Sequence, residues 1–276
     1  MTDSAGRGPA SPPRVTMSRW LAILQAYLQG KDWGVRDLAE VTGLPKSTVH
    51  RILGEMGELS LLVPESRGKR WRLGPEMIHL IVGLADRTEI LEVSRPHLTQ
   101  AATKSGETVY LSLYSRLRRQ FFVAEMVYGD HPYRYWWSER LHDWAEVYVG
   151  SDGKAILAFL PVEEQAAVLG EVADPVPSLS PISKSAFLEQ LNKIRQKGFA
   201  TSIGERYLSS LGASGPILDV EGYPIGSLTI SWPDSRDRVG LDEDLGRLAW
   251  STANAISFAL GGRARDYAPD AEGVAK

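Results

Sequence analysis

The sequence contains no cysteine and no long apolar segment. Without cysteine, this 276-residue chain can form neither disulfides nor thiolate metal sites. No apolar run approaches the roughly 20 residues that a membrane-spanning helix needs. The N-terminus is polar and rich in Pro, Gly and Ser, so it lacks the apolar stretch of a signal peptide. We therefore expect a cytoplasmic protein that does not enter the membrane.

Catalytic and metal-binding motifs are missing as well. The sequence GSDGKA at 150–155 resembles a phosphate-binding loop, but that motif requires glycine where the chain has Tyr148 and serine or threonine where it has Ala155. The run GASGP at 212–216 does not complete GxSxG, because Pro216 stands where the motif requires its final glycine, and the five histidines show no metal-ligand spacing. We expect no cofactor, no metal site and no catalytic residue, and an enzyme in the C-terminal half is the least favoured alternative.

Charge is unevenly distributed along the chain, although the net charge is only −3. The first 74 residues contain 11 Lys and Arg against 7 Asp and Glu, whereas the remaining residues contain 20 against 27. A basic front and an acidic remainder indicate that only the N-terminal part contacts phosphate.

This basic part has the pattern of a helix-turn-helix. Helical spacing of apolar residues predicts helices over 16–28 and 35–42, with a turn at 31–34. Gly43 is expected to end the second helix in a left-handed conformation, and Pro45 suits the first turn of the third. The third helix repeats apolar residues at i, i+3, i+4 and i+7, namely Val49, Ile52, Leu53 and Met56. Short helices separated by a glycine turn are typical of this DNA-binding motif.

Two short strands over 61–63 and 71–73 enclose the turn ESRGKR, which predicts the wing of a winged helix. The third helix would place its N-terminal half in the major groove of double-stranded DNA. Arg51 is the candidate for reading a guanine, because its planar fork suits O6 and N7. The alternative is a sensor or interaction module whose helix-turn-helix contacts only protein. The candidate DNA-binding residues are Arg14, Lys46, Ser47, Thr48, His50, Arg51, Arg67, Lys69 and Arg70.

The remainder of the chain predicts a linker helix and a second domain. The helix over 75–87 is apolar on more than one side, so we expect it to pack on a second subunit, with burial against its own C-terminal domain as the alternative. Strands in hairpins with helices at intervals imply an α+β domain on a mostly antiparallel sheet. The predicted strands are 107–115, 120–127, 133–137, 214–220 and 225–233. The predicted helices are 90–104, 153–160, 183–197 and 241–260, and an acidic segment covers 161–173.

Several ordered motifs resemble the IclR family of bacterial transcriptional regulators over residues 14–262. They include LPKSTVHRIL in the recognition helix, WRLG closing the wing, GETVYLSL, SDGKAILA, IRQKGFA and GASGPILDVEGYPIGSLTISWP. The resemblance implies a winged helix-turn-helix domain, a linker helix and a C-terminal effector-binding domain with a GAF/profilin-like antiparallel sheet. The expected boundaries are 1–13 for a disordered arm, 14–74 for the DNA-binding domain, 75–88 for the linker helix, 89–262 for the effector-binding domain and 263–276 for a disordered tail.

The resemblance also implies homodimers paired through the DNA-binding domains, often assembled as dimers of dimers, and a small-molecule effector. The chain departs from the family pattern at three positions. Tyr148 stands where histidine is common, Ser202 where an acid is common, and Gly212 where cysteine can occur, so family ligands are not transferred. Carried over residue by residue, the effector pocket comprises Gly150, Ser151, Asp152, Ser202, Gly212, Thr229 and Ser231.

The segment 133–148 is unusually aromatic, and aromatic walls bury flat ligands well. We hypothesise a small aromatic effector with a polar substituent, such as a benzoate-like acid or its amide or hydrazide. The alternative is that these rings are core and dimer-contact residues. Its candidate effector-binding residues are Tyr133, Tyr135, Trp137, Trp144 and Tyr148.

Overall fold

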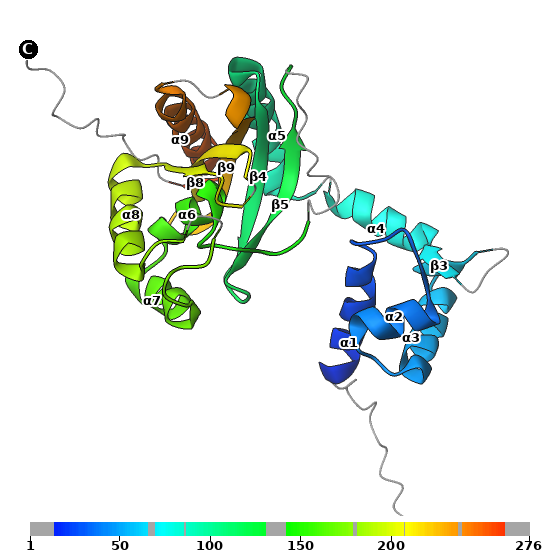
Figure 1. The fold of residues 1–276 in the computed structure, drawn as a ribbon. Helices are drawn as coiled ribbons and strands as arrows, with labels where there is room; N and C mark the ends of the chain where they lie inside the picture. The colour runs from blue at the N-terminus through cyan, green and yellow to red at the C-terminus, as the bar shows by residue number, and fades with distance from the viewer. Residues whose placement is uncertain are drawn as a thin grey trace, which may run out of the picture. The chain divides into compact units, whose positions relative to one another are not determined.

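The computed structural model describes residues 14–65, 70–85, 87–130, 142–178, 181–206, 208–236 and 239–262. The chain divides into two compact units, residues 1–86 and 87–276 (Figure 1). The predicted arm 1–13, strand 133–137 and tail 263–276 lie outside the described residues. In the part of the chain that is described, no helix combines the length and apolar character needed to cross a membrane.

The N-terminal unit contains the three predicted helices and a small sheet. Its elements are α1 (Arg14–Ala26), β1 (Asp32–Gly34), α2 (Val35–Thr42), α3 (Lys46–Glu58), β2 (Leu62–Pro64), β3 (Arg70–Leu73) and α4 (Pro75–Ala85). The predicted turn at 31–34 is wrong, because Asp32–Gly34 forms a strand that pairs with β3, with Trp33 opposite Trp71. A strand of three residues is too short to show an alternating pattern, so only its partner defines it.

Helix α3 is fixed by the apolar stripe that the sequence predicts. Val49, Ile52, Leu53 and Met56 are all completely buried, together with residues of α1, α2 and β2. Gly43 adopts the predicted left-handed conformation, with φ of 68°, where α2 ends. Because one face of α3 forms the core of this unit, its opposite face points to solvent.

The C-terminal unit is an α+β domain built on one antiparallel sheet, as predicted. The sheet has six strands in the order β6-β5-β4-β9-β8-β7, and all its pairings are antiparallel. Its strands are β4 (Thr108–Ser115), β5 (Gln120–Val127), β6 (Ala145–Glu146), β7 (Ala200–Ile203), β8 (Ser210–Leu218) and β9 (Pro224–Pro233). Its helices are α5 (Glu89–Ser105), α6 (Gly150–Phe159), α7 (Val162–Glu171), α8 (Lys184–Lys197), the short 3-10 helix η1 (Asp234–Arg236) and α9 (Leu241–Ala259).

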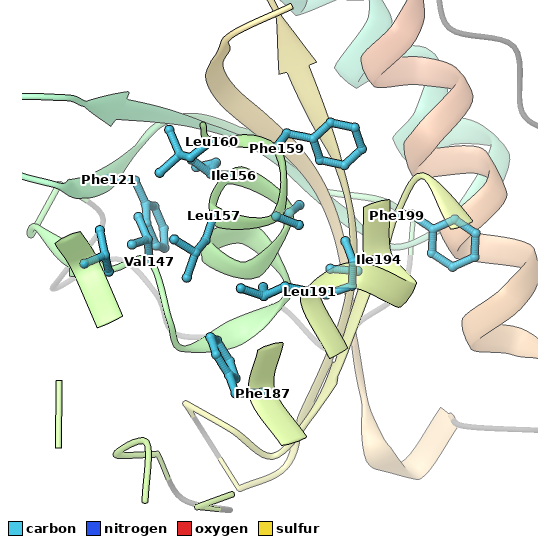
Figure 2. Packing of buried hydrophobic residues seen from close by; sticks show 14 of the residues in the cluster. Phe121, Val147, Ile156, Leu157, Phe159, Leu160, Phe187, Leu191, Ile194 and Phe199 are labelled. Atoms are coloured by element: carbon cyan, nitrogen blue, oxygen red, sulfur yellow. The ribbon is translucent and has the colours of Figure 1, made fainter. Parts of the chain in front are cut away.

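Helices cover both faces of this sheet. Helices α5 and α9 pack on one face, where alternate residues of β9, Leu228, Ile230 and Trp232, join the core. On the other face α6 and α8 form a second core with Phe121 of β5, and Figure 2 shows its side chains. The polar residues of β9 that alternate with the first set are Ser227, Thr229 and Ser231, so α6 lies over a polar strip of the sheet.

Two helices of this unit differ from the sequence prediction by more than one residue at an end. Helix α6 begins at Gly150, three residues before the predicted start at 153, because the Gly-rich turn GSDG has low helix propensity and conceals the first turn. The acidic segment 161–173 contains α7, which starts after Pro161 and places Glu163 and Glu164 in its first turn, where the helix dipole favours acids.

Close packing of β8 on α9 predicts a stability effect. A Cβ at Gly215 would lie 2.8 Å from both the Ala249 carbonyl oxygen and the Trp250 Cα. We expect Gly215→Ala to lower the free energy of unfolding by about 1–3 kcal/mol through overpacking, as measured by urea denaturation. Gly170→Ala is the matched control, because a Cβ at exposed Gly170 meets nothing within 4 Å. Equal stability of the two variants would contradict the prediction.

Candidate functional site

The outward face of α3 carries most of the predicted DNA contacts. Lys46, Ser47, His50 and Arg51 are exposed, and Thr48 is half-buried. Pro45 precedes the helix, and no side chain among the described residues caps its N-terminus. The first backbone N–H groups of a helix are therefore available there, with the positive end of the helix dipole, for a phosphate.

Arg51 lies on this face in an exposed ion pair. Its guanidinium contacts the Glu55 carboxylate one turn later, and the two side chains are 51% and 37% exposed. Pairs of this kind contribute only about 0.3–0.5 kcal/mol. Arg51 can therefore exchange Glu55 for another partner at little cost.

Arg70 has a structural position that the sequence did not predict. Its Nε donates to Asp32 Oδ1 at 2.6 Å, its Nη2 donates to the Asp32 carbonyl oxygen at 3.0 Å, and its Nη1 lies 3.4 Å from Asp37. The hydrogen bond to Asp32 raises the pKa of the guanidinium above its usual value. Arg70 thus ties β3 to β1 and to the start of α2.

The other predicted cations of this unit lie mostly outside the description. Arg67 and Lys69 fall among residues the structure does not describe, and Arg14 lies in α1 with its side chain likewise undescribed. Sequence reasoning did not select Arg72, an exposed cation of β3. Its place inside a predicted strand gave no signal for a contact.

In the C-terminal unit, most of the predicted pocket residues line one small cavity. Its volume is about 20 Å³, which is the room of about one water molecule. Tyr110, Glu205 and Arg206, which were not selected, line it too. A Cβ at Gly212 would lie 2.7 Å from Ser151 Oγ, so glycine keeps the space open. The predicted residues that line it are Gly150, Ser151, Asp152, Ser202, Gly212 and Ser231.

Thr229 lies outside this lining although it shares its sheet face with Ser231. Its Oγ1 is 2.8 Å from Ser214 Oγ, which in turn donates to Ser151 Oγ at 2.8 Å. All three side chains are buried. This hydroxyl chain joins β9, β8 and α6 and fixes the helix on the sheet.

A larger cavity of about 250 Å³ adjoins the small one, and the two share Ser202 and Glu205. Tyr148 contributes to its wall, together with apolar Val176 and Phe187. Burial raises the pKa of the Tyr148 phenol, and the charge of Glu146 adds to the effect.

Of the other predicted aromatic residues, Trp144 is described, and it lines neither cavity. Trp144 packs edge-on against Phe122 at 5.0 Å between ring centroids, and Arg118 lies 4.8 Å over its ring. Tyr133, Tyr135 and Trp137 lie among residues the structure does not describe.

Two buried ion pairs connect α6 to the loop between β7 and β8. The Lys154 ammonium is buried and donates to the Thr201 carbonyl oxygen at 2.9 Å and to the Glu205 carboxylate. The second Glu205 oxygen accepts from the Gly150 backbone N–H at 3.1 Å, at the N-terminus of α6. The second ion pair joins Asp152, two residues before Lys154 on α6, to Arg206.

Tyr110 adds a neutral donor beside Asp152. Its hydroxyl donates to Asp152 Oδ2 at 3.4 Å. Burial raises the pKa of the Tyr110 phenol well above its usual value, and the Asp152 charge raises it further. The phenol therefore stays protonated, and the arrangement offers hydrogen-bonding groups for binding. Within the described segments, no group of three or more His, Asp or Glu residues could hold a metal ion.

Comparison with known proteins covers both units. The model of the IclR helix-turn-helix domain matches residues 17–66, and that of the bacterial transcriptional regulator IclR C-terminal domain matches residues 82–258. The chain is 30% identical to the HTH-type transcriptional regulator TtgV of Pseudomonas putida over 200 residues, which are 72% of this chain and 73% of TtgV.

Solved structures share the fold. The crystal structure of an IclR transcriptional regulator from Alicyclobacillus acidocaldarius has a TM-score of 0.81 at 19% identity, covering 91% of this chain and 100% of that one. An IclR homologue from Microbacterium hydrocarbonoxydans, complexed with 4-hydroxybenzoate, has a TM-score of 0.73 at 20% identity, covering 89% and 99%. Because the family models match both units and the C-terminal model alone spans more than half of the sequence, the chain belongs to the IclR family of bacterial transcriptional regulators.

Proposed function

We propose that this regulator binds operator DNA through α3 and that a small aromatic molecule, bound beneath α6, changes this binding. The observation that carries the proposal is the exposed polar face of α3, held outward by a fully buried apolar stripe on the same helix. Family membership supports DNA as its partner. A protein-binding module would not need the free helix N-terminus and the cations that surround it.

In the proposed complex, the N-terminal half of α3 enters the major groove. Lys46 and the first N–H groups of the helix face a phosphate, and Arg51 leaves Glu55 to form a bidentate contact with guanine. Ser47, Thr48 and His50 are close enough on the helix to add contacts to bases or backbone. The wing residues Arg67 and Lys69 would add phosphate contacts, whereas Arg70 acts mainly by holding the wing strand on β1.

Helix α4 supports a homodimer. None of its residues is buried, and at 100° per residue its apolar side chains cover an arc centred on Ile81, with His79 on the opposite side. A second copy of the same helix would remove this apolar surface from water. A further contact between two such dimers would give the dimer of dimers that the family resemblance implies. The exposed apolar residues of α4 are Ile78, Leu80, Ile81, Val82 and Leu84.

The effector is proposed to occupy the two adjoining cavities, with an apolar ring in the larger and a polar substituent in the smaller. Tyr148, Val176 and Phe187 suit an aromatic acid, amide or hydrazide. The 4-hydroxybenzoate complex of a homologue with the same fold supports this class. Ligand binding would then act by linkage, favouring one spacing of the paired α3 helices, which must match half-sites about 34 Å apart or a multiple of that distance.

Replacing Arg51 by lysine separates base reading from charge. Arg51→Lys keeps the positive charge but loses the planar fork, so discrimination between the DNA upstream of its own gene and random DNA should fall by about 1–3 kcal/mol. Fluorescence anisotropy measures both affinities. Lys46→Ala is the comparison, and it should weaken both DNAs alike and reduce the slope of log K against log salt by about 0.9. If the wild-type protein fails to bind either DNA, the alternative of a non-DNA-binding sensor module is favoured.

A charge at the centre of the apolar arc of α4 should separate the subunits. We expect Ile81→Glu to shift the sedimentation coefficient toward that of the monomer, because the dimer would have to bury a carboxylate. His79→Glu introduces the same charge on the opposite side of the helix and should leave the dimer intact. Identical sedimentation of both variants and the wild type would show that α4 does not form the contact.

Substitutions at Tyr148, which lines the larger cavity, and at Trp144, which does not, should affect ligand binding differently. In calorimetry with aromatic acids, amides and hydrazides, Tyr148→Ala should weaken binding about 3- to 10-fold through the loss of one aromatic contact. Trp144→Ala should leave the affinity unchanged, since Trp144 packs on Phe122 instead. Tight binding of small aliphatic acids with no response to aromatic compounds would contradict the proposed class.

A further inference from the structure

The Arg206 guanidinium fills a site in which every identified partner attracts a planar cation. Its Nη1 donates to Asp152 Oδ2 at 3.0 Å, and its Nη2 donates to Asp152 Oδ1 at 3.2 Å and to the Val149 carbonyl oxygen at 2.6 Å. The guanidinium carbon lies 5.0 Å from the centroid of the Phe121 ring. Two carboxylate oxygens, a carbonyl oxygen and an aromatic face together recognise a flat group rich in N–H donors.

The two members of this ion pair differ in their access to solvent. The Arg206 side chain is 20% exposed and lies on the loop between β7 and β8, whereas the Asp152 side chain is 2% exposed and lies in the first turn of α6. Arg206 can therefore move into water, while Asp152 remains in place. An unpaired buried carboxylate is costly, so whatever replaces Arg206 has to supply N–H donors or positive charge.

The surroundings leave room for such a replacement. A Cβ at Gly150 would lie 2.7 Å from Asp152 Oδ1 and 3.1 Å from Arg206 Nη2, so only glycine admits a planar head group there. The cavity of about 20 Å³ touches Arg206, and the cavity of about 250 Å³ adjoins it. The second cavity offers apolar walls for the body of a ligand.

Charge in the two cavities disfavours an anionic head. Asp152 and Glu205 both line the smaller cavity, and Glu205 lines the larger one as well. Lys154 neutralises Glu205 from behind and is not part of either lining. With Arg206 displaced, the charges of Asp152, Glu205 and Lys154 sum to −1. This net charge repels a carboxylate and attracts a cation.

We propose that Asp152, the Val149 carbonyl and Phe121 form a subsite for a planar N–H donor group of the effector, and that Arg206 occupies this subsite when no effector is bound. The preferred head group is an amidinium, followed by a neutral amide or hydrazide, and a carboxylate is the least favoured of the proposed class. This inference rests on the proposed effector pocket beneath α6 and narrows its ligand class. Arg206 is then a built-in competitor that the effector has to displace.

The experiment compares three probes of equal size and different charge: benzamidinium, benzamide and benzoate. Their dissociation constants are measured by calorimetry on the full chain for the wild type and for Arg206→Ala. The expected order of affinity is benzamidinium, then benzamide, then benzoate. Benzamidinium should bind Arg206→Ala at least about tenfold more tightly than the wild type, since the subsite is then open in every molecule rather than in a small fraction.

Two further variants serve as controls. Arg195→Ala removes an exposed arginine whose guanidinium donates to the Ala158 and Leu160 carbonyl oxygens at the other end of α6, so it should not change the affinity for benzamidinium. Asp152→Asn should abolish the preference for benzamidinium over benzamide, because it removes the negative charge. If Arg206→Ala does not fold, Arg206→Gln, which preserves much of the side-chain volume, replaces it with the same expected direction.

The outcomes separate this inference from the broader proposal. If benzoate binds as tightly as benzamidinium or gains as much affinity in Arg206→Ala, the donor subsite is wrong while an aromatic effector pocket stands. If none of the three probes binds either protein, the effector pocket and the subsite both fail. If Arg195→Ala gains the same affinity as Arg206→Ala, the effect reflects general loosening of the unit, and the assignment to Arg206 is overturned.

Discussion

The complete burial of α6 over a polar strip of the sheet is the constraint on which the C-terminal unit depends. Every residue of this helix is buried, including Asp152 and Lys154. Buried charges of this kind are tolerated only when they are paired, and the loop between β7 and β8 supplies both partners in consecutive positions, Glu205 and Arg206. The same two ion pairs therefore determine where the helix lies, which conformation the loop adopts and how both cavities are shaped.

The N-terminal unit uses charge in the opposite way. The Arg51–Glu55 pair lies on the surface of α3 and is easily exchanged for contacts with a nucleic acid, whereas the Arg206–Asp152 pair is largely buried and resists being broken without replacement. Arg51 is thus exposed and can meet an external partner in the proposed complex, whereas Arg206 is held by an internal carboxylate.

The sequence predicts those features that depend on neighbouring residues. The buried stripe of α3 and the left-handed turn at Gly43 are local signals, and most predicted pocket positions do line one cavity. The missed features are non-local: β1 exists through its pairing with β3, and Arg206 reaches a carboxylate 54 positions earlier in the chain. The aromatic composition near Trp144 did not distinguish a ligand-binding ring from a packing residue. The contact of Trp144 with Phe122 of β5 shows that its ring packs against the sheet.

The two ion pairs between α6 and the loop that joins β7 to β8 have a consequence for redesign of this protein. Positions 152 and 154 carry opposite signs on the helix, and positions 205 and 206 repeat opposite signs in the loop, so each member has one fixed counterpart. In the proposed effector site, a new specificity would therefore be engineered by changing residues 152 and 206 together, while Lys154 and Glu205 are retained because their ion pair holds the helix on the sheet.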